Sequence, residues 1–158
     1  NWGLDKTFKR KDVIGINDIL LLPNDKILVG WSINSVGNAR EGNLRNGNLV
    51  LLNSDGTFDN SFIDQGFNPY CHIHTILLLP DGKIMVGGNF QTYLWVQVNW
   101  IVRLMRDGSI DRTFNKQGRW FDVRDDNENH VTTIESLPNG KIIVGWVFTR
   151  ITASKWEI

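Results

Sequence analysis

Apolar and polar positions recur in a fixed order along the chain. Two short apolar runs around a polar turn read LLLPNDKILVGW at 20–31, LLLPDGKIMVGG at 77–88 and ESLPNGKIIVGW at 135–146. The runs are short, partly β-branched and bracketed by turn residues, whereas helical periodicity is weak. Each phrase therefore predicts two buried strands, and Asp81-Gly82 predicts a two-residue hairpin turn between the second pair.

A second phrase recurs out of phase with the first. It reads DGTFDNSF at 55–62 and DGSIDRTF at 107–114, and a partial copy, NWGLDKTF, opens the chain at 1–8. The Asp-Gly pair predicts a turn between a third strand and a short fourth strand. The expected strands are 15–22, 26–33, 47–53 and 57–62 in the first repeat, and 72–79, 83–90, 100–105 and one ending near Phe114 in the second.

The alternation of the two phrases predicts an all-β fold, because four antiparallel strands repeated every 50–60 residues form a β-propeller blade. The expected boundaries are the end of a preceding blade at 1–13, blades at 14–70 and 71–129, and an incomplete blade at 130–158. Propellers usually have about four to eight blades. The chain would then supply about three blades of a larger or assembled ring. Its open apolar faces would need further blades of the same or a neighbouring chain.

The two phrases resemble the delta-60 repeat family, a β-propeller-type tandem repeat. The resemblance rests on LPDGKI-VGG at 79–88 and DGS-D-TF at 107–114, and departs where Trp31 and Trp146 replace the glycine at Gly88. It implies a module of bacterial surface or secreted proteins, or of phage structural proteins, with an extracellular, cell-surface or virion location. It implies no enzymatic activity and supplies no catalytic positions.

Charge and composition exclude several partners. Lysine plus arginine equals aspartate plus glutamate, 17 each, so no net field favours nucleic acid. No apolar run approaches the roughly 20 residues of a membrane helix, and membrane insertion is not expected. Cys71 is the only cysteine, so the chain has no internal disulfide.

The repeated polar residues point to structure more than to chemistry. Asp5, Asp59 and Asp111 each lie three residues before a phenylalanine. Repetition favours hydrogen bonding to backbone N–H groups of a turn over calcium ligation or acid–base chemistry. No phosphate loop or serine–histidine–aspartate arrangement is present.

The histidines and an acidic segment are the candidates for a metal site. His72 and His74 share a strand face with Cys71 on the other, and His130 is equivalent to His72 in the next repeat. A metal shared by His72 and His130 is the alternative to two ordinary strand-entry histidines, which we favour. The acidic segment 119–129 lacks the order of a known calcium loop. We expect no metal and no cofactor.

Aromatic residues supply the binding candidates. Trp31 and Trp146 fall on the strand faces of apolar neighbours, which predicts packing between blades. The candidate ligand-binding residues lie in connections, where binding residues concentrate; they are Tyr93, Trp95, Trp120 and Trp156. Such side chains stack on sugar rings or anchor protein partners.

The function expected from these features is a non-enzymatic structural and binding propeller module that displays loops to a protein or glycan partner. The alternatives are a carbohydrate-binding propeller lectin and the non-catalytic portion of a propeller enzyme.

Overall fold

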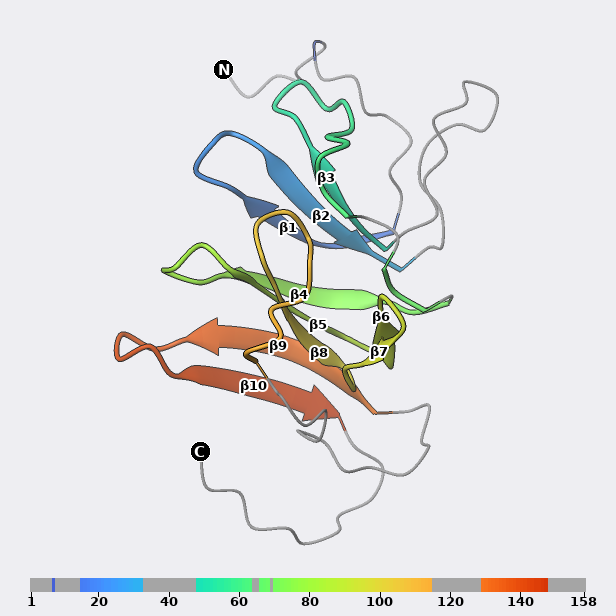
Figure 1. The fold of residues 1–158 in the computed structure, drawn as a ribbon, viewed down its shortest axis with the longest axis vertical. Helices are drawn as coiled ribbons and strands as arrows, with labels where there is room; N and C mark the ends of the chain where they lie inside the picture. Colours follow the sequence, from blue (N-terminus) through green and yellow to red (C-terminus); the bar gives the residue numbers. More distant parts are fainter. Residues whose placement is uncertain are drawn as a thin grey trace, which may run out of the picture.

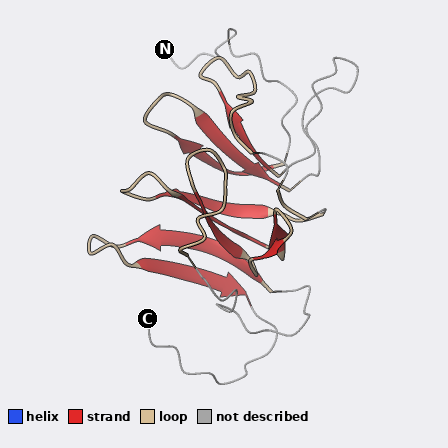
Figure 2. Cartoon of the chain, viewed as in Figure 1, coloured by secondary structure: helices blue, strands red, loops and turns tan. Residues whose placement is uncertain are grey.

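The computed structural model describes residues 7, 15–32, 48–63, 66–68, 70–114 and 129–147, and this part of the chain is built of strands and turns (Figures 1 and 2). The strands are β1 (Ile16–Leu21), β2 (Ile27–Trp31), β3 (Leu49–Leu52), β4 (Ile73–Leu78), β5 (Ile84–Gly88), β6 (Thr92–Tyr93), β7 (Val96–Gln97), β8 (Ile101–Leu104), β9 (His130–Ser136) and β10 (Ile142–Val147). Across these residues no helix has the length and apolarity needed to cross a membrane.

The strands form antiparallel sheets that follow the order of the repeats. The first sheet is β1-β2-β3, the second is β4-β5-β8 and the third is the hairpin β9-β10, and the three are stacked in a row (Figure 1). A separate small hairpin pairs β6 with β7. The all-β class and the first three strands of both full repeats are confirmed.

The fourth strand of each full repeat is shorter than predicted. In the described residues it is reduced to single bridges, Leu52 to Phe58 and Leu104 to Ile110. The physical reason is local, since the Asp111 carboxylate accepts the Thr113 N–H at 2.9 Å just after the bridge and turns the chain away. In the described residues each full repeat therefore has a three-stranded sheet with one bridged residue at its edge, and the predicted four-stranded blade is not confirmed.

The hairpin between β4 and β5 also differs from the prediction in its turn. The Leu79 carbonyl accepts the Gly82 N–H at 2.9 Å, and the Leu79 N–H donates to Lys83 at 2.8 Å. The loop therefore has three residues, with Pro80 at the start of a type I turn and Gly82 at φ 80°. Gly140 repeats this geometry in the third sheet at φ 80°.

Two apolar clusters join neighbouring sheets through equivalent positions. Pro23 and Pro80 lie 57 residues apart in the sequence, and Pro80 and Pro138 lie 58 apart, which sets the correspondence. The first sheet contributes Leu20, Leu22 and Leu28 to its cluster with the second sheet, where Ile73, Ile76 and Leu78 meet them. The second sheet contributes the equivalent Leu77, Leu79 and Met85 to its cluster with the third, where Val131 and Ile134 meet them.

A glycine in the second strand of each repeat allows this close approach. A Cβ on Gly30 would lie 2.6 Å from Ile73 Cγ2, and one on Gly87 would lie 2.5 Å from Val131 Cγ1. Both contacts are too short for real carbon atoms, so the repeated glycine is required by the neighbouring sheet.

Polar groups add specificity to the first junction. The Asn17 side-chain amide donates to the Ile73 carbonyl at 2.7 Å, and the Asp18 carboxylate accepts the Ile76 N–H at 2.6 Å. Backbone groups of β4 therefore bond to side chains of β1 across the junction, which fixes the register of one sheet on the next.

The outer faces of the stack expose the same positions that are covered inside it. Ile19 and Leu21 are 56% and 66% exposed, although their equivalents Ile76 and Leu78 lie in the first junction. At the other end Ile143 is 54% exposed, although its equivalent Met85 is buried.

Candidate functional site

The repeated aspartates hold the chain after the bridged residue. Asp59 Oδ1 accepts the backbone N–H and the hydroxyl of Ser61 at 2.8 and 2.7 Å, and Lys26 donates to its other oxygen. The Lys26 hydrogen bond is the main reason that the pKa of Asp59 is lowered to about 2. Its carboxylate therefore stays charged at neutral pH and is engaged by Ser61 and Lys26.

Asp111 repeats this arrangement with an additional cation. Lys83 lies 3.0 Å and the Arg103 Nε 2.8 Å from its Oδ2, while Thr113 bonds to Oδ1. Burial by itself raises the pKa of Asp111, but bonds from Thr113 and Lys83 and the charge of Arg103 outweigh it and hold the pKa well below its usual range. The predicted structural role of Asp59 and Asp111 is confirmed. Asp5 lies outside the described residues.

The histidines form a row across the second junction. The ring centroids of His72 and His74 are 6.1 Å apart, and those of His74 and His130 are 5.1 Å apart. Burial, followed by the neighbouring His130 and His72 rings, lowers the pKa of His74. In the part of the chain that the structure describes, no group of three or more histidine, cysteine or acidic side chains is arranged to hold a metal ion.

Cys71 and Trp31 are buried, whereas Trp146 is not. Burial raises the pKa of the Cys71 thiol to about 12, which makes it an unreactive core residue. Trp31 is buried in a cluster with Val29 and partly buried Ile27 of its own strand. The described members of this cluster all belong to the first repeat, so packing of Trp31 between blades stays a prediction. Trp146 is half-exposed, because no further sheet in the described residues covers the outer side of β10.

Tyr93, one of the predicted ligand contacts, lies in the core. Its ring is fully buried beside Phe67, with ring centroids 4.5 Å apart. Its hydroxyl donates to the carbonyls of Gly108 at 2.6 Å and Ile63 at 3.1 Å. Tyr93 therefore anchors the base of the β6–β7 hairpin, and its buried ring is not available for contact with a ligand.

Trp95 occupies the tip of that same hairpin. Tyr93 pairs with Val96, so Leu94 and Trp95 form a two-residue loop, with φ values of 48° and 64°. Positive φ at both positions is the requirement of a type I′ turn, which usually takes asparagine and glycine. Each bulky residue in this conformation costs roughly 1–2 kcal/mol, and the Trp95 side chain is 98% exposed. Trp120 and Trp156, the other two candidates, lie outside the described residues.

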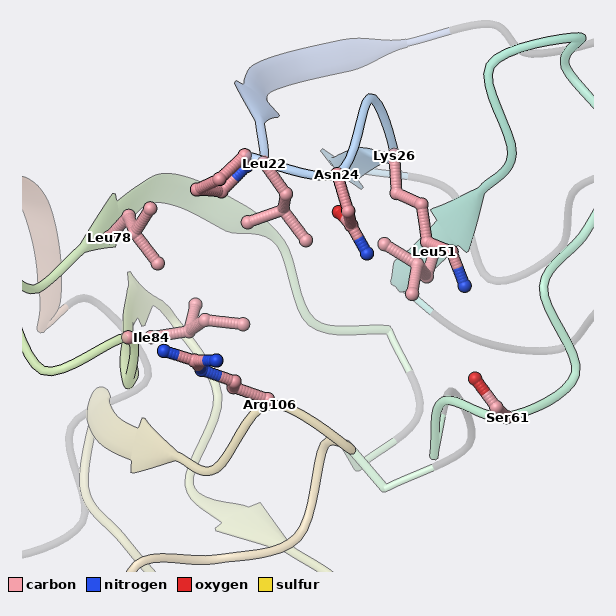
Figure 3. A pocket seen from close by; sticks show the side chains of 10 residues that line it. Leu22, Asn24, Lys26, Leu51, Ser61, Leu78, Ile84 and Arg106 are labelled. Carbon is pink, nitrogen blue, oxygen red and sulfur yellow. The ribbon is translucent and has the colours of Figure 1, made fainter.

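A cleft between the first and second sheets was not anticipated from the sequence (Figure 3). Its volume is about 380 Å³, within the range of small-molecule sites. The apolar wall is made by Leu22, Leu51, Leu78 and Ile84, and the polar groups come from Asn24, Lys26, Ser61 and Arg106. Both turns of the neighbouring hairpins contribute, through Pro23 and Gly82.

Arg106 is the unusual group of the cleft. Among the described residues no acidic side chain pairs with its guanidinium, whereas Lys26 is held by Asp59. Arg106 lies against Gly82, where a Cβ would collide with its guanidinium. Figure 3 shows its guanidinium lying beside the Ile84 side chain.

The second junction carries different residues at positions equivalent to the cleft wall. The strand register makes Leu51 equivalent to Arg103 and Leu78 equivalent to Ser136. Arg103 is already engaged by Asp111 and by the Phe114 ring, 4.8 Å from its guanidinium carbon. The signal in the sequence was this break in the repeat, together with an arginine where the first repeat has Ser54.

Comparison with known families agrees with the stacked sheets. Residues 22–62 and 79–114 match the family model described as "Domain of unknown function (DUF5122) beta-propeller". This match supports a β-propeller repeat family. Both matched segments run from the first hairpin turn to the end of the second phrase, so the β-propeller repeats coincide with the repeated contacts above. No curated protein and no solved structure gave a significant match.

Proposed function

We propose that this chain is a non-enzymatic structural and binding segment of a β-propeller in a surface, secreted or virion protein. The resemblance to the delta-60 repeats supports this assignment, and so does the use of repeated aspartates and glycines for folding. The repeated polar residues form turns and ion pairs within the fold. The surface that binds a partner must therefore lie where the repeat is interrupted.

The open faces support the structural half of the proposal. Ile19 and Leu21 expose one side of the first sheet, and Ile143 exposes the far side of the third. Among the described residues a Cβ on Gly145 would meet Thr133 and Thr132 of its own hairpin, whereas one on Gly87 would meet another sheet. Further blades of the same or a neighbouring chain would cover these positions as the internal junctions do.

The exposed Trp95 supports the binding role in this proposal. A tryptophan costs free energy both by its exposure and by its positive φ, and the fold offers no packing in return. The hairpin beneath it is fixed by the buried Tyr93, so the indole is presented on a rigid support. Such a side chain suits stacking on a sugar ring or insertion into a protein partner.

The test is a binding screen of the full-length protein against a glycan array and a displayed peptide library. We expect hits that weaken at least about tenfold in Trp95→Ala, the loss expected when a buried aromatic anchor is removed. Tyr70→Ala is the matched control, because Tyr70 is also an exposed aromatic residue with positive φ.

The two classes of hit decide between the partners. Trp95-dependent glycan hits would assign the lectin alternative, and Trp95-dependent peptide hits would assign a protein partner. Hits that bind equally well to Trp95→Ala would contradict the display role of this hairpin.

A further inference from the structure

We infer that the cleft between the first and second sheets is a binding site for a small ligand that joins an apolar chain or ring to a carboxylate. The site is separate from the Trp95 hairpin and from the open faces. It does not depend on the proposed display function.

The shape of the cleft comes from substitutions within the repeat. Leu51 presents a shorter, apolar side chain where the second junction has Arg103, and Leu78 presents an apolar side chain where it has Ser136. The guanidinium of Arg103 therefore has no counterpart at position 51, and the cleft there is lined by Leu51 and by Ile84, which is 1% exposed. About 380 Å³ is enough for a ligand of small-molecule size.

The charge in the cleft selects an anion. Arg106 and Lys26 both line it, and none of the described residues that line it is an aspartate or glutamate. The Lys26 charge is balanced by Asp59, so the guanidinium of Arg106 leaves one positive charge uncompensated by the described residues. The planar fork of a guanidinium matches the two oxygens of a carboxylate.

The apolar wall selects the remainder of the ligand. Leu22, Leu51 and Leu78 lie on the same cleft as Arg106, so a carboxylate held by the arginine would direct its apolar part onto leucine side chains (Figure 3). Burial of that part contributes roughly 25 cal/mol per Å². An inorganic anion would make only the charge contact with Arg106. A neutral apolar molecule would make only the apolar contact with the leucine side chains.

The experiment is a titration of the whole chain with hexanoate, followed by amide NMR shifts and calorimetry. Hexanamide, which has the same chain without the charge, and inorganic phosphate, which has charge without the chain, are titrated in parallel. We expect saturable binding of hexanoate and weakening by about tenfold or more in Arg106→Gln, because a hydrogen bond to a charged group is lost. Arg112→Gln, which removes an exposed arginine outside the cleft, is expected to bind hexanoate as the unaltered chain does.

Each result decides the proposal. Shifts confined to the cleft, lost in Arg106→Gln but kept in Arg112→Gln, would support it. The proposal is overturned if hexanoate does not bind, if Arg106→Gln binds it equally, or if phosphate or hexanamide binds as tightly as hexanoate. Arg106 is exposed, so its substitution should leave the fold intact, and the amide spectrum of the variant checks this directly. Failure of this test would leave the Trp95 experiment unaffected.

Discussion

Gly87 is the position at which the stacking of the sheets is most directly tested. In Gly87→Ala the new Cβ would lie 2.5 Å from Val131 Cγ1 and 3.0 Å from Ile134 Cδ1, both on the third sheet, and 2.9 Å from Thr75 Cγ2. Val131 is fully buried and branched, so it cannot move aside freely.

The magnitude follows from two opposing effects. Overpacking of a filled core costs about 1–3 kcal/mol, whereas replacing glycine by alanine stabilises by about 0.4–1 kcal/mol through the unfolded chain. We therefore expect Gly87→Ala to lower the free energy of unfolding by about 1–2 kcal/mol. For a domain of this size that corresponds to a fall in Tm of roughly 2–8 °C.

The assay is urea unfolding followed by tryptophan fluorescence, with Gly145→Ala as the matched control. Gly145 is the equivalent glycine, but in the described part of the chain its Cβ would meet Thr133 Cγ2 at 2.8 Å and Thr132 Oγ1 at 3.5 Å, both within its own hairpin. Thr133 is exposed and able to shift, so we expect a change within about 0.5 kcal/mol. If Gly87→Ala is no less stable than Gly145→Ala, with unchanged denaturant dependence, the stacking argument is refuted.

Two further predictions concern polar groups that the fold uses. The pKa of Asp59 is lowered to about 2 from 3.8, so its stabilising contribution is complete above pH about 4 and is lost as the pH falls toward 2; acid titration of the unfolding free energy should show this loss, and an equal loss in Asp59→Asn would contradict it. Tyr93→Phe leaves the buried carbonyl of Gly108 without its hydroxyl donor, and we expect it to lower the unfolding free energy by about 1–3 kcal/mol. Urea unfolding measures the effect, and no change would show that the hairpin is not anchored by this bond.

The local pattern of apolar and polar residues was sufficient to predict the strands, because turn residues precede and follow each apolar run. Apolar runs before and after Pro80-Asp81-Gly82 predicted β4 and β5 to within one or two residues of the observed ends. The fourth strand was overestimated for a reason that the pattern cannot display. Whether Asp111 continues a strand or caps a turn depends on the hydroxyl and N–H of Thr113.

The aromatic candidates show a different limit of sequence reasoning. Tyr93 and Trp95 are two residues apart in the same connection, yet one is fully buried and the other 98% exposed. Their difference arises from the two-residue turn, which reverses the chain between Tyr93 and Val96 and places Trp95 at its tip. It also depends on carbonyls 15 and 30 residues away, to which the Tyr93 hydroxyl is bonded. Neither is encoded in the local alternation of apolar and polar residues.

The repeat gives a way to separate folding requirements from candidate chemistry in this chain. Lys26 and Lys83 each pair with the aspartate of their own repeat, and Gly30 and Gly87 each admit the next sheet. A contact that equivalent residues make in both repeats must have a role that both repeats share, and that shared role is the stacking of the sheets. A feature made once has no such explanation. Arg106 stands where the first repeat has a serine, and its charge is not balanced by an acidic side chain of the described ranges. The binding proposal rests on this departure from the repeat, beside an apolar wall.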